Sequence, residues 1–407
     1  MNCRHCGSAL QLPLVDLGAA PLSNAYLTRQ QLHAPEKWYP LRVLVCETCW
    51  LVQTEDYLGA EEIFSDDYAY FSSVSTTWLD HARRYVSNMS SRLGLGAQSM
   101  VAEIASNDGY LLQYVRERGI PCYGVEPTKS TAAAARGKGI PVIEEFFGKK
   151  LAARLAGDRK RADLVVANNV LAHVPDINDF VAGAALLLKP DGVATFEFPY
   201  LINLVRENQF DTIYHEHYSY LSLSAVDRIF RANGLTIIDV ESLTTHGGSI
   251  RVFAKNISTG AKAGSAVIAM LEEERRLGVT QLKFYSGFQD RAELVKNALL
   301  TFLLEQKRAG RKIGAYGAAA KGNTLLNFAG LRSDLLPWVT DRSAVKQGKY
   351  LPGSRIPIVD EMRLREEKPD WVLILPWNLR DEIVSQLGYI RAWGGQFVAA
   401  VPELSIS

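Results

Sequence analysis

The chain has 407 residues, of which 47% are hydrophobic and 22% charged, a composition typical of folded globular proteins and too apolar for a disordered one. Its 45 basic and 44 acidic residues give a formal net charge of +1, so we expect neither a nucleic acid nor a membrane surface as a partner. No apolar stretch approaches the roughly 20 residues that cross a bilayer, and the start lacks a signal-peptide pattern, so a cytoplasmic protein is expected.

The pattern along the chain divides it into three parts, as expected because a chain of this length exceeds one ordinary core. We expect these parts to cover residues 1–75, 76–260 and 261–407. The first is rich in turn residues and shows little helical periodicity. An amphipathic helix over Thr77–Leu93 opens the second part, and Gly94 ends that helix.

Four of the five cysteines form two C-x-x-C pairs, Cys3/Cys6 and Cys46/Cys49. In a chain without a secretion signal, this spacing indicates metal ligation more than disulfides. Four thiolates complete the tetrahedral shell that Zn²⁺ prefers, so we expect a structural zinc site. Unmetallated thiols or a redox pair are the alternatives, and the sequence between the pairs lacks the basic patch of a DNA-binding zinc ribbon. Cys122 stands alone and is expected to be a buried small hydrophobe.

From residue 99 onward, strand patterns alternate with helix patterns. The strands are expected at 99–105, 121–127, 162–170 and 192–200, and the helices at 108–119, 130–139 and 179–190. Helices of this length between strands imply right-handed crossovers and a parallel sheet. A later pair, 235–243 and 248–256, predicts an antiparallel addition at the sheet edge. After a charged, helix-favouring stretch at 264–309, a second alternating pattern starts at Lys312 and predicts a smaller α/β unit.

The first strand leads into a turn that predicts a cofactor site. Small residues follow Glu103 and Gly109 precedes the helix, which leaves room for a ligand at the carboxyl edge of the sheet. Glu126, at the end of the second strand, can accept both ribose hydroxyls. Ala105 and Asn107 occupy the places of the first two glycines of G-x-G-x-x-G. Because they restrict the close approach of a pyrophosphate, the turn favours S-adenosylmethionine, a cation without phosphates, over a dinucleotide.

A third set of polar residues follows the strand at 162–170. Asn168, Asn169 and His173 are expected at the same carboxyl edge of the sheet. A helix cap or a packing role is the alternative for His173.

The run Tyr214, His215, Glu216, His217 lies just beyond the last parallel strand and is flanked by further tyrosines. His-x-His suggests a metal site, but no other ligand lies at the right spacing, so a second metal is disfavoured. General acid–base chemistry fits better, since an imidazole can remove a proton, a carboxylate can orient it and a phenol can stabilise an enolate oxygen. The alternative is an aromatic-rich loop that packs against the sheet.

Taken together, these motifs resemble those of the sugar C-methyltransferases of deoxysugar pathways, which include 3-C-methyltransferases acting on dTDP-linked 4-keto-6-deoxy hexoses. The resemblance covers nearly the whole chain and rests on EIASNDGYLL, GVEPT, NNVLAHVPD, EFPYL, DTIYHEHYSYLS, HGGSIRVF and GAYGAAAKGNTLLN. It implies an α/β fold with an N-terminal zinc-binding module, a central Rossmann-like methyltransferase domain that binds S-adenosylmethionine, and a second, C-terminal Rossmann-like α/β domain.

The resemblance also implies roles for individual residues. His217 would be the general base, Tyr214 and Glu216 would assist at the enolate, and Tyr68 or Tyr70 would close over the cofactor. The expected cofactor-binding residues are Tyr70, Glu103, Ala105, Asn107, Gly109, Glu126, Asn168 and His173. The expected substrate-binding residues are Tyr68, Asn203, Tyr218, His246, Lys321, Asn323, Asp341 and Lys346. Ala105 stands where such enzymes often carry glycine, which predicts a slightly displaced cofactor turn.

In the second α/β unit, the segment 314–323 precedes a helix. Its backbone amides, the helix N-terminus and Lys321 predict an anchor for a sugar-nucleotide diphosphate, with a packing turn as the alternative. Asp341, Lys346 and Lys349 are expected to line the same cleft.

The predicted reaction adds a methyl group to C3 of a nucleotide-linked 4-keto-6-deoxy sugar. A nicotinamide-dependent oxidoreductase acting on a nucleotide sugar and a non-catalytic zinc scaffold are the rival interpretations. The sequence leaves the nucleotide (dTDP or GDP), the exact sugar, the stereochemistry and the oligomeric state open, a monomer included.

Overall fold

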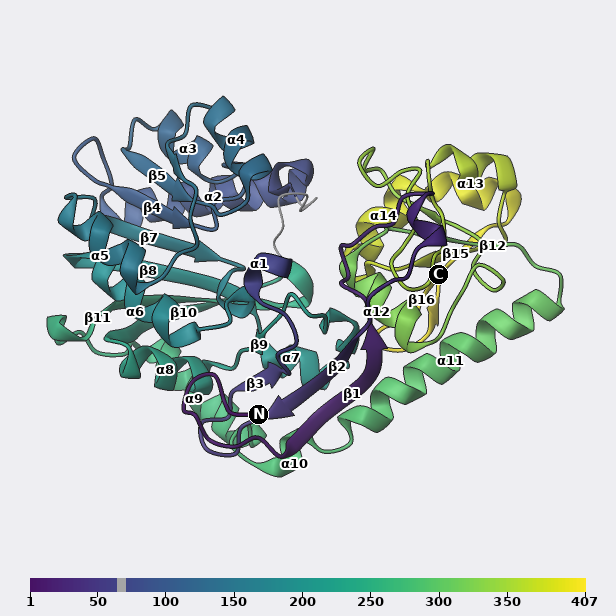
Figure 1. The fold of residues 1–407 in the computed structure, drawn as a ribbon, viewed down its shortest axis with the longest axis horizontal. Coiled ribbons are helices and arrows are strands. Elements are labelled where there is room, and N and C mark those ends of the chain that lie inside the picture. The colour runs from purple at the N-terminus through teal and green to yellow at the C-terminus, as the bar shows by residue number, and fades with distance from the viewer. Residues whose placement is uncertain (64–70) are drawn as a thin grey trace.

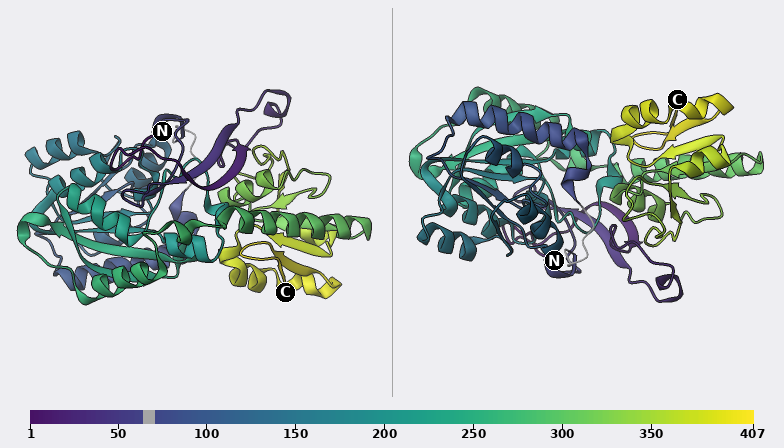
Figure 2. Two further views of the ribbon diagram at one scale, coloured as in Figure 1. Left: turned by 90° about the horizontal axis from the view of Figure 1, so that it is seen from below. Right: turned by 90° about the horizontal axis from the view of Figure 1, so that it is seen from above.

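The structure, a computed structural model, describes residues 1–63 and 71–407, except for the side chains of Ala60 and His246. Figure 1 shows two lobes, with the N-terminal strands between them and the long helix α11 (Phe288–Arg308) along one of them. The two views of Figure 2 show these strands crossing one side of the junction between the lobes. No helix in the described ranges is long and apolar enough to cross a bilayer.

The larger lobe is built on a seven-stranded sheet in the order β10-β11-β8-β7-β4-β5-β6. In that order its strands are Leu235–Leu243, Ser249–Asn256, Leu188–Pro199, Ala162–Asn168, Val101–Ile104, Cys122–Val125 and Val142–Ile143. The strands from β8 to β6 run parallel, whereas β10 and β11 are antiparallel additions. The predicted parallel sheet and its antiparallel edge are therefore confirmed, and only β6 was not expected.

Helices cover both faces of this sheet. They are α2 (Thr76–Leu93), α3 (Leu112–Glu117), α4 (Lys129–Gly137), α5 (Lys149–Gly157), α6 (Ile177–Leu187) and α8 (Leu223–Ala232). Leu164 and Val166 of β7 pack with α2 and α3, while the alternate residues Val165 and Ala167 pack with α5, α6 and α8. The predicted helix before Gly94 is confirmed, because Gly94 adopts φ +61° at its end.

The N-terminal part forms a sheet that the sequence did not predict. Strands β1 (Leu12–Ala20), β2 (Tyr39–Val45) and β3 (Val52–Thr54) pair antiparallel, and β9 (Ser219–Tyr220) adds to β3. The sequence indicated only many turn residues and little helical periodicity here, and turn residues do lie between these strands. Through β9, this sheet includes the residues just after the Tyr-His-Glu-His run.

The smaller lobe holds a six-stranded sheet in the order β14-β13-β12-β15-β16-β17, parallel except for β17. In that order the strands are Ile358–Val359, Val339–Thr340, Ile313–Tyr316, Trp371–Ile374, Gln396–Ala399 and Ser405–Ile406. Its helices are α12 (Ala320–Phe328), α13 (Met362–Glu367) and α14 (Arg380–Gln386), and α9 (Ser265–Leu277), α10 (Leu282–Tyr285) and α11 lead into it. The second α/β unit is thus confirmed, while the domain limits given above remain a proposal.

Candidate functional site

The carboxyl ends of β4, β5 and β7 form a polar edge, which we call the cofactor edge. After β4 the chain passes through Ala105 at φ +56° and Asn107 at φ +49°, both in the left-handed region that disfavours side chains. Gly109 follows at φ +76°, where an added Cβ would lie 2.4 Å from Ile140 Cδ1. The turn therefore requires glycine at 109 and holds two residues in strained backbone conformations.

The cofactor edge contains buried polar atoms that have no hydrogen-bond partner within the described part of the chain. They are both carboxylate oxygens of Glu103, Ser106 Oγ, Asp108 Oδ1, the amide oxygen and nitrogen of Asn168, and Asn169 Oδ1. Burial, with smaller contributions from Asp108 and Glu126, raises the pKa of Glu103 well above its usual range, and Tyr110 only partly opposes this shift. Each unsatisfied group costs about 1–3 kcal/mol, so this edge fits a ligand rich in polar groups such as S-adenosylmethionine.

Glu126 differs from Glu103 because its carboxylate already has partners. Its Oε2 accepts from the Asn107 amide and its Oε1 from the Thr128 amide, each at 2.9 Å. Burial raises the pKa of Glu126, and these hydrogen bonds limit the rise. The residue thus ties the turn to β5 and keeps lone pairs that could accept from ribose hydroxyls.

Two residues of the Tyr-His-Glu-His run, Tyr214 and His217, lie together with the predicted residue His173. His217 donates its Nδ1 hydrogen to the Thr212 carbonyl at 2.8 Å, since a carbonyl can only accept, and this places the ring's lone pair on Nε2. The Tyr214 ring lies 4.0 Å from the His217 ring between centroids, and the His173 ring lies 4.7 Å away. His173 in turn donates from Nδ1 to the Glu216 carbonyl at 2.9 Å.

The other two residues of the run face the N-terminal part. His215 donates from Nε2 to the Pro40 carbonyl at 3.1 Å. Glu216 is buried, and its Oε1 accepts from the Asn24 side chain at 3.1 Å. Burial raises the pKa of Glu216 and lowers that of His215. The Glu216 carboxylate is therefore bonded to Asn24. Glu216 is also linked to His217 indirectly, because the Glu216 carbonyl accepts from His173, whose ring packs against the His217 ring.

All three parts of the chain bind the segment Phe210–Tyr218, which includes this run; we call it the catalytic segment after the general base that the sequence predicts within it. The segment starts with the 3-10 turn η4 (Phe210–Thr212). From the N-terminal part, Thr54 donates its hydroxyl hydrogen to the His217 carbonyl at 3.0 Å. From the central part, the Ala172 carbonyl accepts from the Tyr218 amide at 2.8 Å. From the C-terminal part, Thr324 donates its hydroxyl hydrogen to the Ile213 carbonyl at 2.7 Å.

The predicted diphosphate anchor lies at the start of α12. Lys321 donates to Asn378 Oδ1 at 2.6 Å and lies over the Trp377 ring, and burial lowers its pKa while the charge of Asp211 opposes that shift. The predicted residues Asp341 and Lys346 both bind the backbone of Ala318. The Ala318 amide donates to Asp341 Oδ2, and the Ala318 carbonyl accepts from Lys346, each at 2.8 Å.

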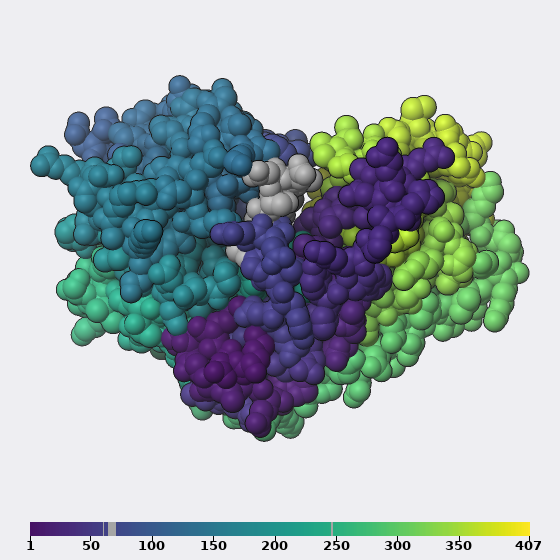
Figure 3. All heavy atoms as spheres, in the orientation of Figure 1, coloured from purple at the N-terminus to yellow at the C-terminus, as the bar shows by residue number. Residues whose placement is uncertain are grey.

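The remaining predicted substrate residues are more dispersed. Asn323 is buried beneath the anchor and donates to the Ser23 carbonyl at 2.6 Å. Asn203, on α7 (Leu201–Arg206), lies against Gly248, where an added Cβ would meet its amide nitrogen at 2.0 Å. Tyr218 donates to the Leu58 carbonyl at 3.2 Å. The predicted residues Tyr68 and Tyr70, and the side chain of His246, lie outside the described residues. Figure 3 shows the surface hollowed between the two lobes.

The two cysteine pairs converge as the sequence predicts. The Sγ atoms of Cys3, Cys6, Cys46 and Cys49 all lie within 4.8 Å of one another. Tetrahedral zinc with Zn–S bonds of about 2.3 Å places sulfurs about 3.8 Å apart, so the quartet fits the ion. The knuckles dock on the larger lobe, where Asn178 of α6 donates to the His5 carbonyl at 2.8 Å.

The chain is 35% identical over 402 residues to C-methyltransferase NovU from Streptomyces niveus, and the match covers 99% of this chain and 96% of NovU. The chain belongs to the C-methyltransferase family. Family models match it as a zinc binding domain at residues 3–64, a methyltransferase domain at 78–240 and a C-methyltransferase C-terminal domain at 244–402. It is an S-adenosylmethionine-dependent methyltransferase with an N-terminal zinc-binding domain. The oxidoreductase alternative has no support in these matches.

Two solved structures resemble part of this C-methyltransferase. The 1,6-didemethyltoxoflavin-N1-methyltransferase of Burkholderia thailandensis shares 19% identity and a TM-score of 0.37, covering 51% of this chain and 94% of that one. Magnesium protoporphyrin IX methyltransferase from Synechocystis PCC 6803 shares 15% identity and a TM-score of 0.35, covering 43% and 82%. Matches at this level add nothing to the family assignment.

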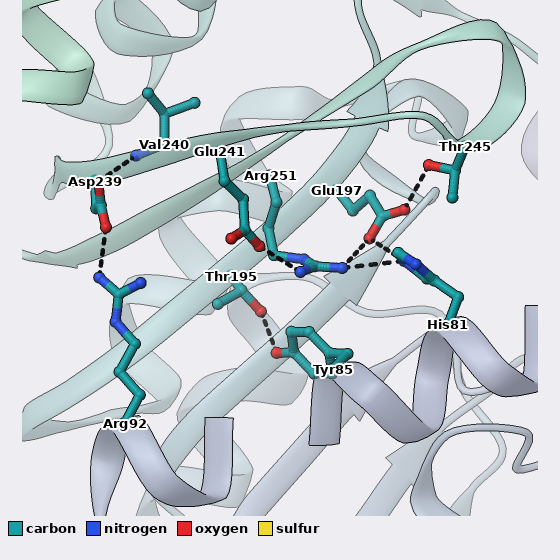
Figure 4. A network of polar contacts seen from close by, with 10 residues as sticks. All are labelled: His81, Tyr85, Arg92, Thr195, Glu197, Asp239, Val240, Glu241, Thr245 and Arg251. Atoms are coloured by element: carbon teal, nitrogen blue, oxygen red, sulfur yellow. Dashed lines mark hydrogen bonds and ion pairs between the residues drawn. The ribbon is translucent and has the colours of Figure 1, made fainter. Parts of the chain in front are cut away.

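A buried ionic network lies beside the cofactor edge (Figure 4), and we did not predict it from the sequence. Glu197, at the end of β8, accepts from Arg251 of β11 at 2.5 Å, from His81 of α2 at 2.9 Å and from Thr245 at 3.1 Å. Burial would raise the pKa of Glu197, but the His81 hydrogen bond and the Arg251 charge outweigh it, and the pKa is lowered. A lone acid inside the apolar run VATFEF was the available signal, because a buried carboxylate requires a partner.

Cys122 is less buried than the sequence predicted. Its side chain, at the start of β5, is only partly buried, because β5 lies near the edge of the sheet beside β6. Burial still raises the pKa of its thiol to about 11, so it is a weak nucleophile.

Proposed function

We propose that this C-methyltransferase methylates C3 of a nucleotide-linked 4-keto-6-deoxy sugar and that His217 is the general base. The observation that carries the proposal is the hydrogen bond that sets the tautomer of His217. Its Nδ1 hydrogen is bound to the Thr212 carbonyl at 2.8 Å, which leaves Nε2 as the proton-accepting atom. The same carbonyl would stabilise the imidazolium that forms when the proton arrives.

In the proposed mechanism, the ketone at C4 acidifies the hydrogen on C3. His217 Nε2 accepts this proton, the electrons of the C–H bond delocalise onto the C4 oxygen, and the Tyr214 hydroxyl donates to the resulting enolate. When bound, S-adenosylmethionine would supply the electrophilic methyl group: C3 bonds to this carbon as its bond to sulfur breaks, the C4 carbonyl re-forms, and S-adenosylhomocysteine leaves. Orientation of two bound reactants can contribute about 7–11 kcal/mol. The burial of His217 supports this role, because exclusion of water protects an enolate from reprotonation.

The turn before α12 offers an anchor for the nucleotide end of the substrate. Lys321 carries three N–H donors, of which one is directed to Asn378, so it can also bind a phosphate oxygen. Lys346 contributes a second positive charge to the same turn, and the helix N-terminus favours an anion. We propose that the diphosphate binds here and that the predicted cofactor residues bind S-adenosylmethionine at the cofactor edge. The predicted Asn203, Tyr218 and Asp341 would complete the substrate site.

Incubation of the protein with S-adenosylmethionine and a panel of dTDP- and GDP-linked 4-keto sugars in D₂O, followed by mass spectrometry, tests the proposal. One added methyl group identifies the acceptor, and deuterium at C3 without methylation reveals proton abstraction. If no keto sugar in the panel gains either label, the proposed substrate class is wrong.

The variant His217→Asn tests the base itself, because the asparagine amide is polar like the imidazole and can still form hydrogen bonds, but it has no basic nitrogen to remove a proton. We expect kcat to fall by about 10²- to 10⁴-fold, with little change in the Kd for S-adenosylmethionine measured by calorimetry. Near-normal methylation by this variant would rule out His217 as the base.

A further inference from the structure

Two side chains of the C-terminal α/β unit donate hydrogen bonds to the start of the catalytic segment. Thr324 of α12 donates its hydroxyl hydrogen to the Ile213 carbonyl at 2.7 Å. Trp377 donates its indole N–H to Asp211 Oδ2 at 2.7 Å. The ring of Phe328, also from α12, packs edge-on against the ring of Phe210 in turn η4, with the two ring centroids 5.6 Å apart. These contacts join residues that are more than a hundred positions apart in the chain.

The carbonyl of Thr212 lies between these two points in the chain, and it is the acceptor for His217 Nδ1. Asp211 and Ile213, on either side of it, have no exposed surface. Because buried polar groups depend on protein partners, the groups that Thr324 and Trp377 supply help to hold this turn, in addition to its own backbone hydrogen bonds. The acceptor that sets the His217 tautomer is therefore held from the other lobe.

We infer that the C-terminal α/β unit positions the general base, with Thr324 and Trp377 holding turn η4 so that the Thr212 carbonyl fixes the orientation and tautomer of His217. This inference rests on the proposed function and deepens it, since it assigns to the C-terminal unit a part in proton transfer besides substrate binding. Misplacement of a catalytic group by 1 Å can lower a rate by about 100-fold. Thr324 and Trp377 are thus positioning residues.

A matched pair of variants at Thr324 tests the inference. Thr324→Val keeps the shape and removes the hydroxyl donor, whereas Thr324→Ser keeps the donor. We expect Thr324→Val to lower both kcat and the rate of deuterium uptake at C3 by about 10- to 100-fold, with much smaller changes in KM and in the Kd for S-adenosylmethionine. Deuterium uptake is measured with S-adenosylhomocysteine in place of the methyl donor. Thr324→Ser should remain close to wild type.

The pH profile of kcat/KM separates positioning from a general loss of stability. Moving the Thr212 carbonyl changes the stabilisation of the His217 imidazolium, so the acidic limb of the profile should shift in Thr324→Val and not in Thr324→Ser. Trp377→Phe removes the indole donor together with the outer part of the ring that lies against Gly247 and under Lys321. Trp377→Phe should also shift the acidic limb of the pH profile. It provides the test of positioning if Thr324→Val does not fold.

Wild-type kcat and an unshifted acidic limb in folded Thr324→Val or Trp377→Phe, with His217→Asn inactive, would overturn the inference and leave the proposed function standing. Normal methylation by His217→Asn would instead remove the proposed function and the inference together.

Discussion

The cofactor edge and the catalytic segment lie next to each other, yet they are organised in opposite ways. The cofactor edge is built from the ends of neighbouring strands, and Glu103 and Asn168 retain buried polar atoms without partners in the described chain. The catalytic segment is bound instead by residues distant in the chain, namely Thr54, Ala172 and Thr324.

The difference indicates two kinds of preorganisation. At the cofactor edge, polar groups are arranged for a ligand, and the protein bears their desolvation cost until that ligand binds. At the catalytic segment, the protein satisfies the backbone itself, so that His217 is oriented before any substrate arrives. Changes to distant residues should therefore disturb the catalytic segment more than the cofactor edge.

Loss of the zinc site should give the largest effect. Cys46→Ser removes one of the four ligands, at the end of β2. Strand β2 pairs with β3, and β3 contains Thr54, which donates to the His217 carbonyl. We expect loss of bound zinc by metal analysis and loss of nearly all methylation, because structural zinc supplies folding energy outright. Cys122→Ser, outside the quartet, is the control and should retain both. Full activity in zinc-free Cys46→Ser would show that the N-terminal part does not hold the segment.

Glu197→Gln should destabilise the cofactor edge. It leaves the buried Arg251 paired with Glu241, whose side chain is partly exposed and so screened by water, and breaking a buried ion pair costs about 3 kcal/mol or more. Glu241→Gln removes a partly exposed partner of the same arginine and should cost about 1 kcal/mol or less. Urea unfolding of both variants measures the difference. Equal losses would contradict a special role for the buried carboxylate.

The same network predicts a pH dependence. Because the pKa of Glu197 is lowered in the folded protein, its contribution to stability is complete above its unfolded pKa of about 4.3 and is lost as the pH falls through the folded pKa. Urea unfolding of wild type and Glu197→Gln should therefore converge as the pH is lowered below that value. A gap between them that stays constant with pH would show that the charge of Glu197 is not the source.

Lys321→Ala should affect binding more than chemistry. Loss of a charge-assisted hydrogen bond to phosphate is worth about 1.5–3 kcal/mol, so we expect KM for the nucleotide sugar to rise by roughly 10- to 100-fold with a smaller fall in kcat. Steady-state kinetics with varied sugar concentration measure both constants. Lys283→Ala, an exposed lysine on α10 outside the predicted cleft, is the control. An unchanged KM in Lys321→Ala would remove the proposed anchor.

The smallest effect is expected at the strained cofactor turn. Ala105→Gly relieves a left-handed residue and should stabilise the protein by about 0.5 kcal/mol, whereas Gly109→Ala combines a positive φ with a clash against Ile140 and should destabilise it. Thermal unfolding compares the two variants. A lower Tm for Ala105→Gly would show that the alanine side chain makes contacts that outweigh the backbone strain.

Much of the fold and of the cofactor edge could be predicted because both depend on local pattern. The periodicity of strands such as 162–170 predicted the parallel sheet, and parallel strands must end at one edge. The Cys3/Cys6 and Cys46/Cys49 spacing likewise indicated their shared ligand. Strand β1 was missed because its residues alternate poorly, with shifts in register between Pro13 and Val15 and between Asp16 and Ala19.

The sequence by itself therefore determined which reactive groups this protein carries, namely four sulfurs, acidic strand ends and an imidazole near a phenol in the chain. Only the tertiary structure decided which atoms hold that imidazole, since nothing near Thr54 or Thr324 in the chain marks either hydroxyl as a donor to the catalytic segment. The physical reason is that a hydrogen bond depends on distance and angle in space, and those are set when the separate cores of the two lobes pack together.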